Sequence, residues 1–151
     1  MGLLYRLNFY FNGKLQTNKV KYAVKIFDFI HSVDNKKLAK KIADEQIKSD
    51  TKVKIFLQVN FDNEIQKSGV QKKELEDLLR YCHEIGLNVI GLMCIPPINI
   101  DPYPFFQELK NLNEKLGLSE LSMGMSSDYE IALKNSSTYL RIGSNIFGKR
   151  S

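Results

Sequence analysis

The sequence lacks features that would assign it to several common classes of protein. It contains no apolar run of about 18 residues, so we expect no membrane-spanning helix. Its two cysteines, Cys82 and Cys94, are too few for a disulfide framework and lack the paired spacing of a zinc site, so no metal site is predicted. Arg6 and Asn8 interrupt the apolar N-terminal stretch, which is unlike a signal peptide. We therefore expect a cytoplasmic protein with reduced, buried thiols.

Glycine-rich phosphate-binding turns are also missing. The chain contains neither GxGxxG nor the P-loop pattern GxxxxGK followed by Ser or Thr. An open sheet that binds nucleotides needs such a turn after its first strand. The sequence therefore does not favour a nucleotide-binding sheet.

Composition indicates an ordinary globular protein with an uneven distribution of charge. The 151 residues, 43% hydrophobic and 26% charged, suffice for a single domain over 1–151 with a real core. Residues 14–54 hold eleven of the 22 basic side chains and only five acidic ones. The lysines of 36–41 surround apolar residues at helical spacing, which is typical of the solvated face of an amphipathic helix. We expect no nucleic-acid binding, and a basic interaction module is an alternative supported by this charge alone.

Short apolar runs alternate with segments of helical periodicity along the chain. Strands are expected at 7–11, 29–33, 53–60, 88–95, 121–125 and 139–142. Helices are expected between them, with N-terminal caps at Thr17 and Asp34 and a capping box from Ser127 to Glu130. Gly86 is the expected stop of one of these helices.

This alternation predicts an α/β fold of about six βα units with parallel strands and right-handed crossovers. An open doubly wound sheet and a truncated (β/α)8 TIM-type barrel both fit this pattern. Polar residues gather just after strand ends, at the rim where barrels carry their active sites. These residues include Asn18, His31, Asn60, Ser126, Arg141 and Ser144.

The last two strand ends carry the most informative polar residues. Ser126 and Ser127 follow one strand and precede a helix, and Gly143 and Ser144 do the same one unit later. Helix N-termini offer unpaired backbone N–H groups and the positive end of the helix dipole, which suits a phosphate. A phosphate site is one interpretation of these residues, and simple helix N-caps are the other.

Five stretches of the chain carry a resemblance to a known family. They are GKLQTNKVKY at 13–22, FIHSVDN at 29–35, IFLQVNFDNEIQKSG at 55–69, GLMCIPP at 91–97, and SMGMSSDYEIAL with YLRIGSNIFGKR at 122–150. In this order they resemble the pyridoxal phosphate homeostasis proteins (the YggS/PROSC type) over roughly residues 9–150. The resemblance implies a barrel like the N-terminal domain of alanine racemases, and residues 1–8 match nothing in it.

The resemblance also implies a function. Such a protein binds pyridoxal 5′-phosphate (PLP) and acts in vitamin B6 homeostasis as a non-catalytic carrier or regulator, not as an enzyme. PLP-requiring apo-enzymes are its implied acceptors, no membrane or nucleic acid is implied as a partner, and the oligomeric state is left open.

By the same resemblance, Ser126 contacts the phosphate together with the backbone around Gly143 and Ser144. Arg141 faces the pyridine nitrogen. Because a guanidinium stays charged and cannot accept the ring proton, this contact would weaken the cofactor as an electron sink. Met123 lines the ring pocket in this interpretation, with core packing as its alternative.

His31 and Asn60 are placed on the same rim by the resemblance. The alternative for His31 is a half-buried histidine with its hydrogen bonds satisfied. Both residues are therefore candidates for cofactor contact rather than assigned ligands.

The family barrel begins with two further strand–helix units, and the first carries the lysine that forms a Schiff base with PLP. Neither unit is recognisable in this sequence, and Lys19, ahead of Lys14, is the conjectured replacement. Two alternatives follow. The chain is a non-functional fragment that needs a separate N-terminal piece, or a PLP-dependent racemase-like enzyme, against which the missing lysine argues.

Overall fold

A computed structural model describes residues 7–62 and 67–148 of the chain. The strands form one sheet in which every pairing is parallel, and its main path follows the order of the chain. The path runs through β1 (Tyr10–Phe11), β2 (Phe29–Val33), β3 (Lys54–Asn60), β5 (Asn88–Met93), β6 (Glu120–Met125) and β7 (Tyr139–Arg141). The short β4 (Val70–Gln71), which the sequence did not predict, pairs with the end of β3.

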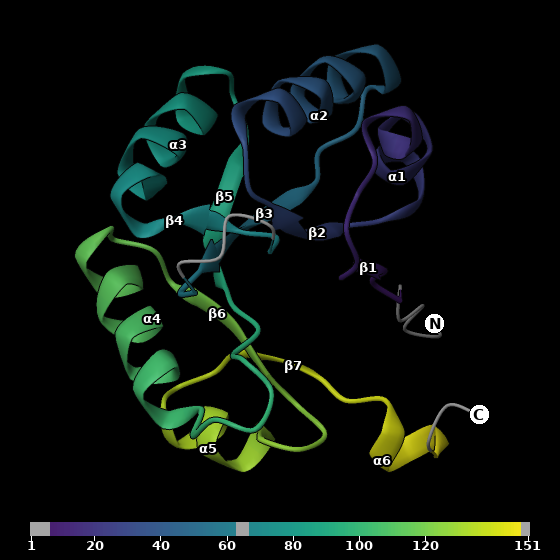
Figure 1. The fold of residues 1–151 in the computed structure, drawn as a ribbon. Helices are drawn as coiled ribbons and strands as arrows, with labels where there is room; N and C mark the ends of the chain where they lie inside the picture. The colour runs from purple at the N-terminus through teal and green to yellow at the C-terminus, as the bar shows by residue number, and fades with distance from the viewer. Residues whose placement is uncertain (1–6, 63–66, 149–151) are drawn as a thin grey trace, which may run out of the picture.

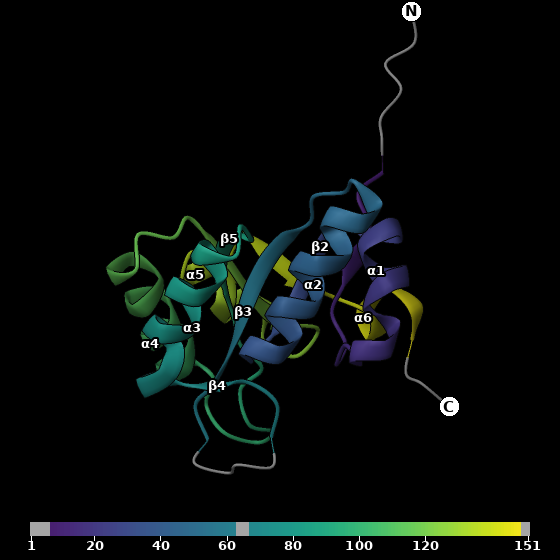
Figure 2. The same ribbon diagram turned by 90° about the horizontal axis from the view of Figure 1, so that it is seen from above.

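A helix follows each strand of the main path. The helices are α1 (Val20–Ile26), preceded by the 3₁₀ turn η1 (Thr17–Lys19), α2 (Lys36–Ser49), α3 (Lys72–Glu84), α4 (Tyr103–Lys115), α5 (Tyr129–Lys134) and α6 (Ser144–Phe147). Figure 1 shows α1 to α5 on the outside of a curved sheet, and in Figure 2 β3 is visible between α2 and α3. Within the described ranges, none of these helices is long and apolar enough to cross a bilayer.

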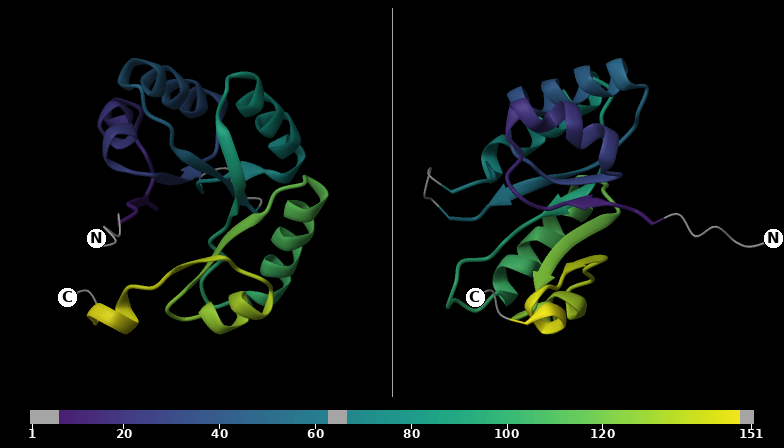
Figure 3. Two further views of the ribbon diagram at one scale, coloured as in Figure 1. Left: turned by 180° about the vertical axis from the view of Figure 1, so that it is seen from behind. Right: turned by 90° about the vertical axis from the view of Figure 1, so that its right-hand side faces the viewer.

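The sheet forms an arc rather than a closed barrel. The arc opens between β1 and α6, as the view from behind also shows (Figure 3). Among the described strands, β1 pairs only with β2, and β7 only with β6. The α/β fold of about six parallel βα units, a truncated (β/α)8 barrel, is confirmed.

The outer face of the sheet and the helices share the main hydrophobic core. Helices α2 and α3 bury Ile42 and Leu75 in it, at the helical spacing that the sequence predicts. Helix α4 contributes Phe106, which has no exposed surface. Each βα unit thus buries one apolar helix face on the sheet.

The inner face of the sheet holds a second, smaller cluster. Phe29, Phe56 and Met93 are buried there, and Tyr139 packs against them. The Tyr10 and Tyr139 rings, from the first and last strands, have centroids 5.9 Å apart. Aromatic side chains from the first and last strands therefore meet on the concave face of the arc.

The predicted N-terminal cap of α2 is wrong by one residue. Asn35, not Asp34, caps α2, because its Oδ1 accepts a hydrogen bond of 2.8 Å from the Leu38 N–H. Asp34 accepts instead from the Gly69 N–H at 3.0 Å. The Asp34 carboxylate thus fixes a distant loop, which local spacing cannot reveal.

The other two predicted caps also differ. Thr17 opens the η1 turn, and no side chain caps either η1 or α1. Helix α5 starts after Asp128, so the capping box at Ser127 does not form. The Asp128 carboxylate accepts from the Met125 N–H at 2.6 Å and closes the turn after β6 instead.

The first strand is shorter than expected. It contains only Tyr10 and Phe11 of the predicted segment 7–11. The Phe9 N–H donates to the Asp28 carboxylate at 2.9 Å, so it is not available to a sheet ladder. Residues 1–6 lie outside the described residues.

Candidate functional site

The carboxyl ends of β6 and β7 border a cavity of about 510 Å³. Four of the predicted site residues line it, namely Ser126, Arg141, Gly143 and Ser144. The remaining lining residues are Met125, Ser127, Phe147 and Gly148. Because parallel strands present their carboxyl ends at one edge, the two loops meet although they lie about one βα unit apart in sequence.

Ser126 joins these two loops. Its Oγ lies 3.3 Å from both the Gly143 and the Asn145 backbone nitrogens, whose N–H groups donate to it. The Asn145 side-chain amide donates to the Ser126 carbonyl at 3.0 Å. Two backbone N–H groups therefore converge on the Ser126 hydroxyl oxygen at the edge of the cavity, and N–H groups gathered in this way can also bind an anion.

Arg141 brings a permanent positive charge to the same cavity. Its guanidinium donates to Ser122 Oγ at 2.6 Å and to the Cys94 carbonyl at 2.8 Å. Burial lowers the pKa of Arg141, but a guanidinium keeps its charge at neutral pH. The arrangement holds a charged donor that cannot accept a proton.

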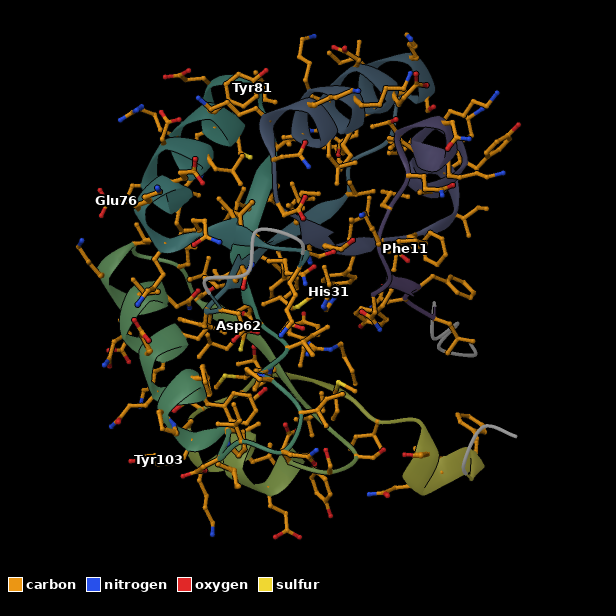
Figure 4. The ribbon with its side chains drawn as sticks, viewed as in Figure 1. Phe11, His31, Asp62, Glu76, Tyr81 and Tyr103 are labelled. Carbon is orange, nitrogen blue, oxygen red and sulfur yellow. The ribbon has the colours of Figure 1, made fainter. Side chains whose placement is uncertain are left out.

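His31 lies on the inner side of β2 and is linked to Arg141 through Ser122. Its Nδ1 is 2.7 Å from Ser122 Oγ, and its ring packs against Phe56 with a centroid distance of 4.3 Å. Figure 4 shows His31 directed into the concave side of the sheet. Burial, aided by the Arg141 charge, lowers the pKa of His31 to about 4. The imidazole is therefore neutral near pH 7.

Asn60 and Met123 lie apart from this cavity. Asn60 lines a different hollow, between β3 and the segment after β5, and its Oδ1 accepts from the Asp62 N–H at 2.8 Å. Met123 is buried in the main core and is not among the residues that line this cavity, which agrees with the core-packing alternative. Successive strand residues point to opposite faces, and Ser122 occupies the inner one.

Sequence reasoning missed Ser122 and Asn145. Ser122 is fully buried between His31 and Arg141, and Asn145 fastens the loop that carries Gly143. The position of Ser122 between Leu121 and Met123 could have revealed it, because strand alternation directs it to the face opposite these two core residues. No local signal in the sequence points to Asn145.

The two conjectured lysines are exposed. Lys14 and Lys19 are not among the residues that line the cavity at β6 and β7. In the part of the chain that the structure describes, that lining contains no lysine. A covalent bond from either residue to a ligand in this cavity therefore has no support in the geometry.

Comparisons with known protein families agree with this architecture. Residues 7–151 match the family model described as alanine racemase, N-terminal domain. A pyridoxal phosphate homeostasis protein of Aquifex aeolicus is 39% identical over 154 residues, which cover 95% of this chain and 68% of the relative. Its counterpart in Escherichia coli is 31% identical, covering 95% of this chain and 65% of the relative. The chain thus spans about two thirds of the length of these curated relatives.

Solved structures show the same fold. PipY of Synechococcus elongatus without PLP has a TM-score of 0.90 and 32% identity, covering 96% of this chain and 73% of PipY. PipY with PLP bound has a TM-score of 0.88 and 31% identity, covering 96% and 72%. An arginine decarboxylase of Paramecium bursaria Chlorella virus has a TM-score of 0.68 and 16% identity. The match covers 89% of this chain and 45% of the decarboxylase, and it shows the fold alone.

Proposed function

Because the chain belongs to the pyridoxal phosphate homeostasis family of alanine racemase N-terminal domains, we propose that it binds PLP in vitamin B6 homeostasis. The proposal is that it does so as a carrier or regulator, without catalysing a reaction of its own. The single observation that carries it is the convergence of Ser126, the Gly143 N–H and Arg141 on one cavity. A solved relative, PipY, is described with PLP bound.

The residues of the cavity fit the two ends of PLP. Ser126 and the backbone N–H groups of Gly143 and Asn145 form an anion cradle for a phosphate. Gly143 leaves this approach open, since nothing lies within 4 Å of the position that a Cβ would take. Arg141 would donate to the pyridine nitrogen. PLP supplies a reactive aldehyde and an electron-withdrawing ring when bound.

The absence of catalysis is a proposal supported by the chemistry of Arg141. A guanidinium donates hydrogen bonds but cannot protonate the ring nitrogen, so the ring withdraws electrons only weakly. His31 is neutral at pH 7, and Ser122 lies between it and Arg141. Racemisation of a substrate carbon also needs acid–base groups on both faces of the ring.

Further parts of the proposal concern the setting of the protein. We place it in the cytoplasm as a single domain whose PLP is passed to apo-enzymes that require it. Both cysteines are buried and free, as in a protein of a reducing compartment.

A PLP titration of the purified chain tests the function. We expect saturable binding with a change in visible absorbance, and at least a tenfold loss of affinity in Ser126→Ala and in Arg141→Ala. Leu133→Ala, an exposed apolar truncation on α5, is the matched control and should bind normally. Absence of binding by the wild-type chain would refute the proposal and favour a fragment that needs a separate N-terminal piece.

Borohydride reduction followed by intact mass measurement tests how PLP is held. We expect no covalent adduct, because no lysine lines the described cavity. An adduct of one PLP would instead show that a lysine of this chain reaches the cofactor, and peptide mapping would first examine Lys19. A racemase-like activity on amino acids would contradict the non-catalytic part of the proposal.

A further inference from the structure

We propose that Ser122 and His31 are positioning residues that fix the Arg141 guanidinium in the direction from which it donates to the cofactor's ring nitrogen. The inference rests on the proposed function, because it assigns the groups that set the geometry of the same site. Neither residue lines the cavity, so both act through Arg141.

The direction of each hydrogen bond follows from the chemistry of its partners. Arg141 carries only donors, so it donates to Ser122 Oγ at 2.6 Å. The single proton of Ser122 is then free to be donated to His31 Nδ1 at 2.7 Å. The chain of donors therefore runs from Arg141 through Ser122 to His31.

This direction also fixes the tautomer of His31. A neutral imidazole that accepts at Nδ1 carries its proton on Nε2. The opposite assignment would leave the Ser122 proton without an acceptor as well as Nε2 without a partner. Nε2 is buried and has no hydrogen-bond partner among the described residues in either case. The first assignment leaves fewer buried polar groups unsatisfied and is favoured.

Aromatic packing holds the imidazole in place. His31 is 2% exposed, and its ring centroid lies 4.3 Å from Phe56, 5.8 Å from Tyr139 and 5.9 Å from Tyr10. These rings come from three strands, so they restrict the imidazole from several sides. A rotation that moved Nδ1 away from Ser122 would drive the ring into one of them.

Arg141 is held at two points with its cavity side free for a ligand. Ser122 anchors one terminal nitrogen and the Cys94 carbonyl the other at 2.8 Å. A guanidinium has five N–H donors, and these bonds engage two of them. The same side chain lines the cavity. Hydrogen bonds from both terminal nitrogens restrict the orientation of the planar group more than one bond would, because a single bond leaves the group free to rotate about it.

Double-mutant binding experiments with PLP test the inference. We expect Ser122→Ala and His31→Phe each to weaken PLP binding about tenfold and to shift the absorbance maximum of bound PLP. In an Arg141→Lys background we expect Ser122→Ala to have no further effect, because the group it positions is gone. His31→Asn, whose amide oxygen can replace Nδ1 as acceptor, should recover most of the affinity.

Ser32→Ala is the matched control. Ser32 lies next to His31, is 4% exposed, and its hydroxyl has no hydrogen-bond partner among the described residues. Its removal should leave affinity and spectrum unchanged. If Ser122→Ala binds PLP like the wild type, or costs as much affinity in the Arg141→Lys background as it does when Arg141 is present, the inference is overturned.

The ¹⁵N chemical shifts of His31, recorded without PLP, separate this inference from the proposed function. We expect a neutral imidazole with its proton on Nε2 in the wild type, and a change of these shifts in Ser122→Ala. A proton on Nδ1 would overturn the inference. Absence of PLP binding with the expected shifts would refute the proposed function alone and leave the hydrogen-bonded chain supported.

Discussion

The two faces of the same sheet are built from different chemistry. The outer face packs against the helices through a large core dominated by aliphatic residues, whereas the inner face holds a small group of rings around His31. Neighbouring residues of β3 illustrate the contrast, because Ile55 belongs to the outer core and Phe56 to the inner cluster. Strand alternation thus separates the residues that stabilise the fold from those that shape the site.

Polar groups are tolerated on the inner face where they have hydrogen-bond partners. On β6, Leu121 and Met123 join the outer core, while Ser122 between them is buried on the inner side. A buried hydroxyl is costly unless it has partners, and Ser122 has two. The inner face accepts polar residues because they bind one another and Arg141.

The largest expected effect is in the outer core. Ile42→Ala on α2 should lower the free energy of unfolding by about 2–5 kcal/mol, because it removes buried methyl groups and leaves a cavity. Ile47→Ala on the same helix is the control, since Ile47 is 80% exposed and its truncation should cost about 0.5 kcal/mol or less. Urea unfolding followed by circular dichroism measures both. Equal losses would break the assignment of the outer face.

The inner face should respond to pH. The pKa of His31 falls from 6.5 to about 4 on folding, so between these values the unfolded chain binds more protons. The contribution of neutral His31 to the free energy of unfolding should therefore be fully present above pH 6.5. It should be lost as the pH falls towards 4, by about 3 kcal/mol in total. The charged and titratable groups that face His31 are Arg141, Tyr10 and Tyr139.

His31→Phe isolates this contribution. Glu45, Glu76 and Asp77 on the helices also have lowered pKa values, so acid destabilises the wild type through them as well. The difference between the free energies of unfolding of wild type and His31→Phe, measured with urea at several pH values, cancels the contribution of these carboxylates. A variant as sensitive as the wild type between pH 6.5 and 4 would show that His31 is not the group responsible.

Two neighbouring residues of β3 allow a matched test of the outer and inner faces. Phe56→Leu and Ile55→Val should each lower stability by about 1 kcal/mol, one through lost ring contacts and one through a lost methylene. Only Phe56→Leu should also weaken PLP binding, because Phe56 supports the His31 ring at 4.3 Å. Parallel unfolding and PLP titrations decide this. Weakened binding in Ile55→Val would remove the functional distinction between the faces.

The smallest expected change in stability is at the edge of the cavity. Ser126→Ala removes an acceptor whose donors are exposed to water, so stability should change by about 0.5 kcal/mol or less. Binding of PLP should nevertheless fall about tenfold. Competition by inorganic phosphate, strong in the wild type, should weaken in the variant. Unchanged competition would show that Ser126 does not contact the phosphate.

The sequence predicted the elements better than their ends. Periodicity identified the strand at β2 and the helix at α3, which buries Leu75, Leu78 and Cys82. The predicted cap at Thr17 makes no capping hydrogen bond. The cap at Asp34 was wrong because Asp34 accepts a hydrogen bond from a residue 35 positions away, and such a partner has no local signature. Element type depends on local pattern, whereas a boundary depends on competing partners.

The candidate site was predictable in part for the same reason. Ser126 and Gly143 follow successive strands, and parallel strands bring their carboxyl ends together, so their meeting was foreseeable. For Met123 the sequence left a ring pocket and core packing open, and its strand position directs it to the core. Its neighbour Ser122 has the inner position that the sequence alone did not assign.

By itself, the sequence determined the alternation of strands and helices, the apolar helix faces and the family, since these depend on local periodicity and ordered motifs. Only the tertiary structure decided that Ser122 joins His31 to Arg141, residues 91 and 19 positions away from it. The register of several strands and the curvature of the sheet set that contact. No local pattern encodes it, because a hydrogen bond between strands depends on where the whole arc places each one.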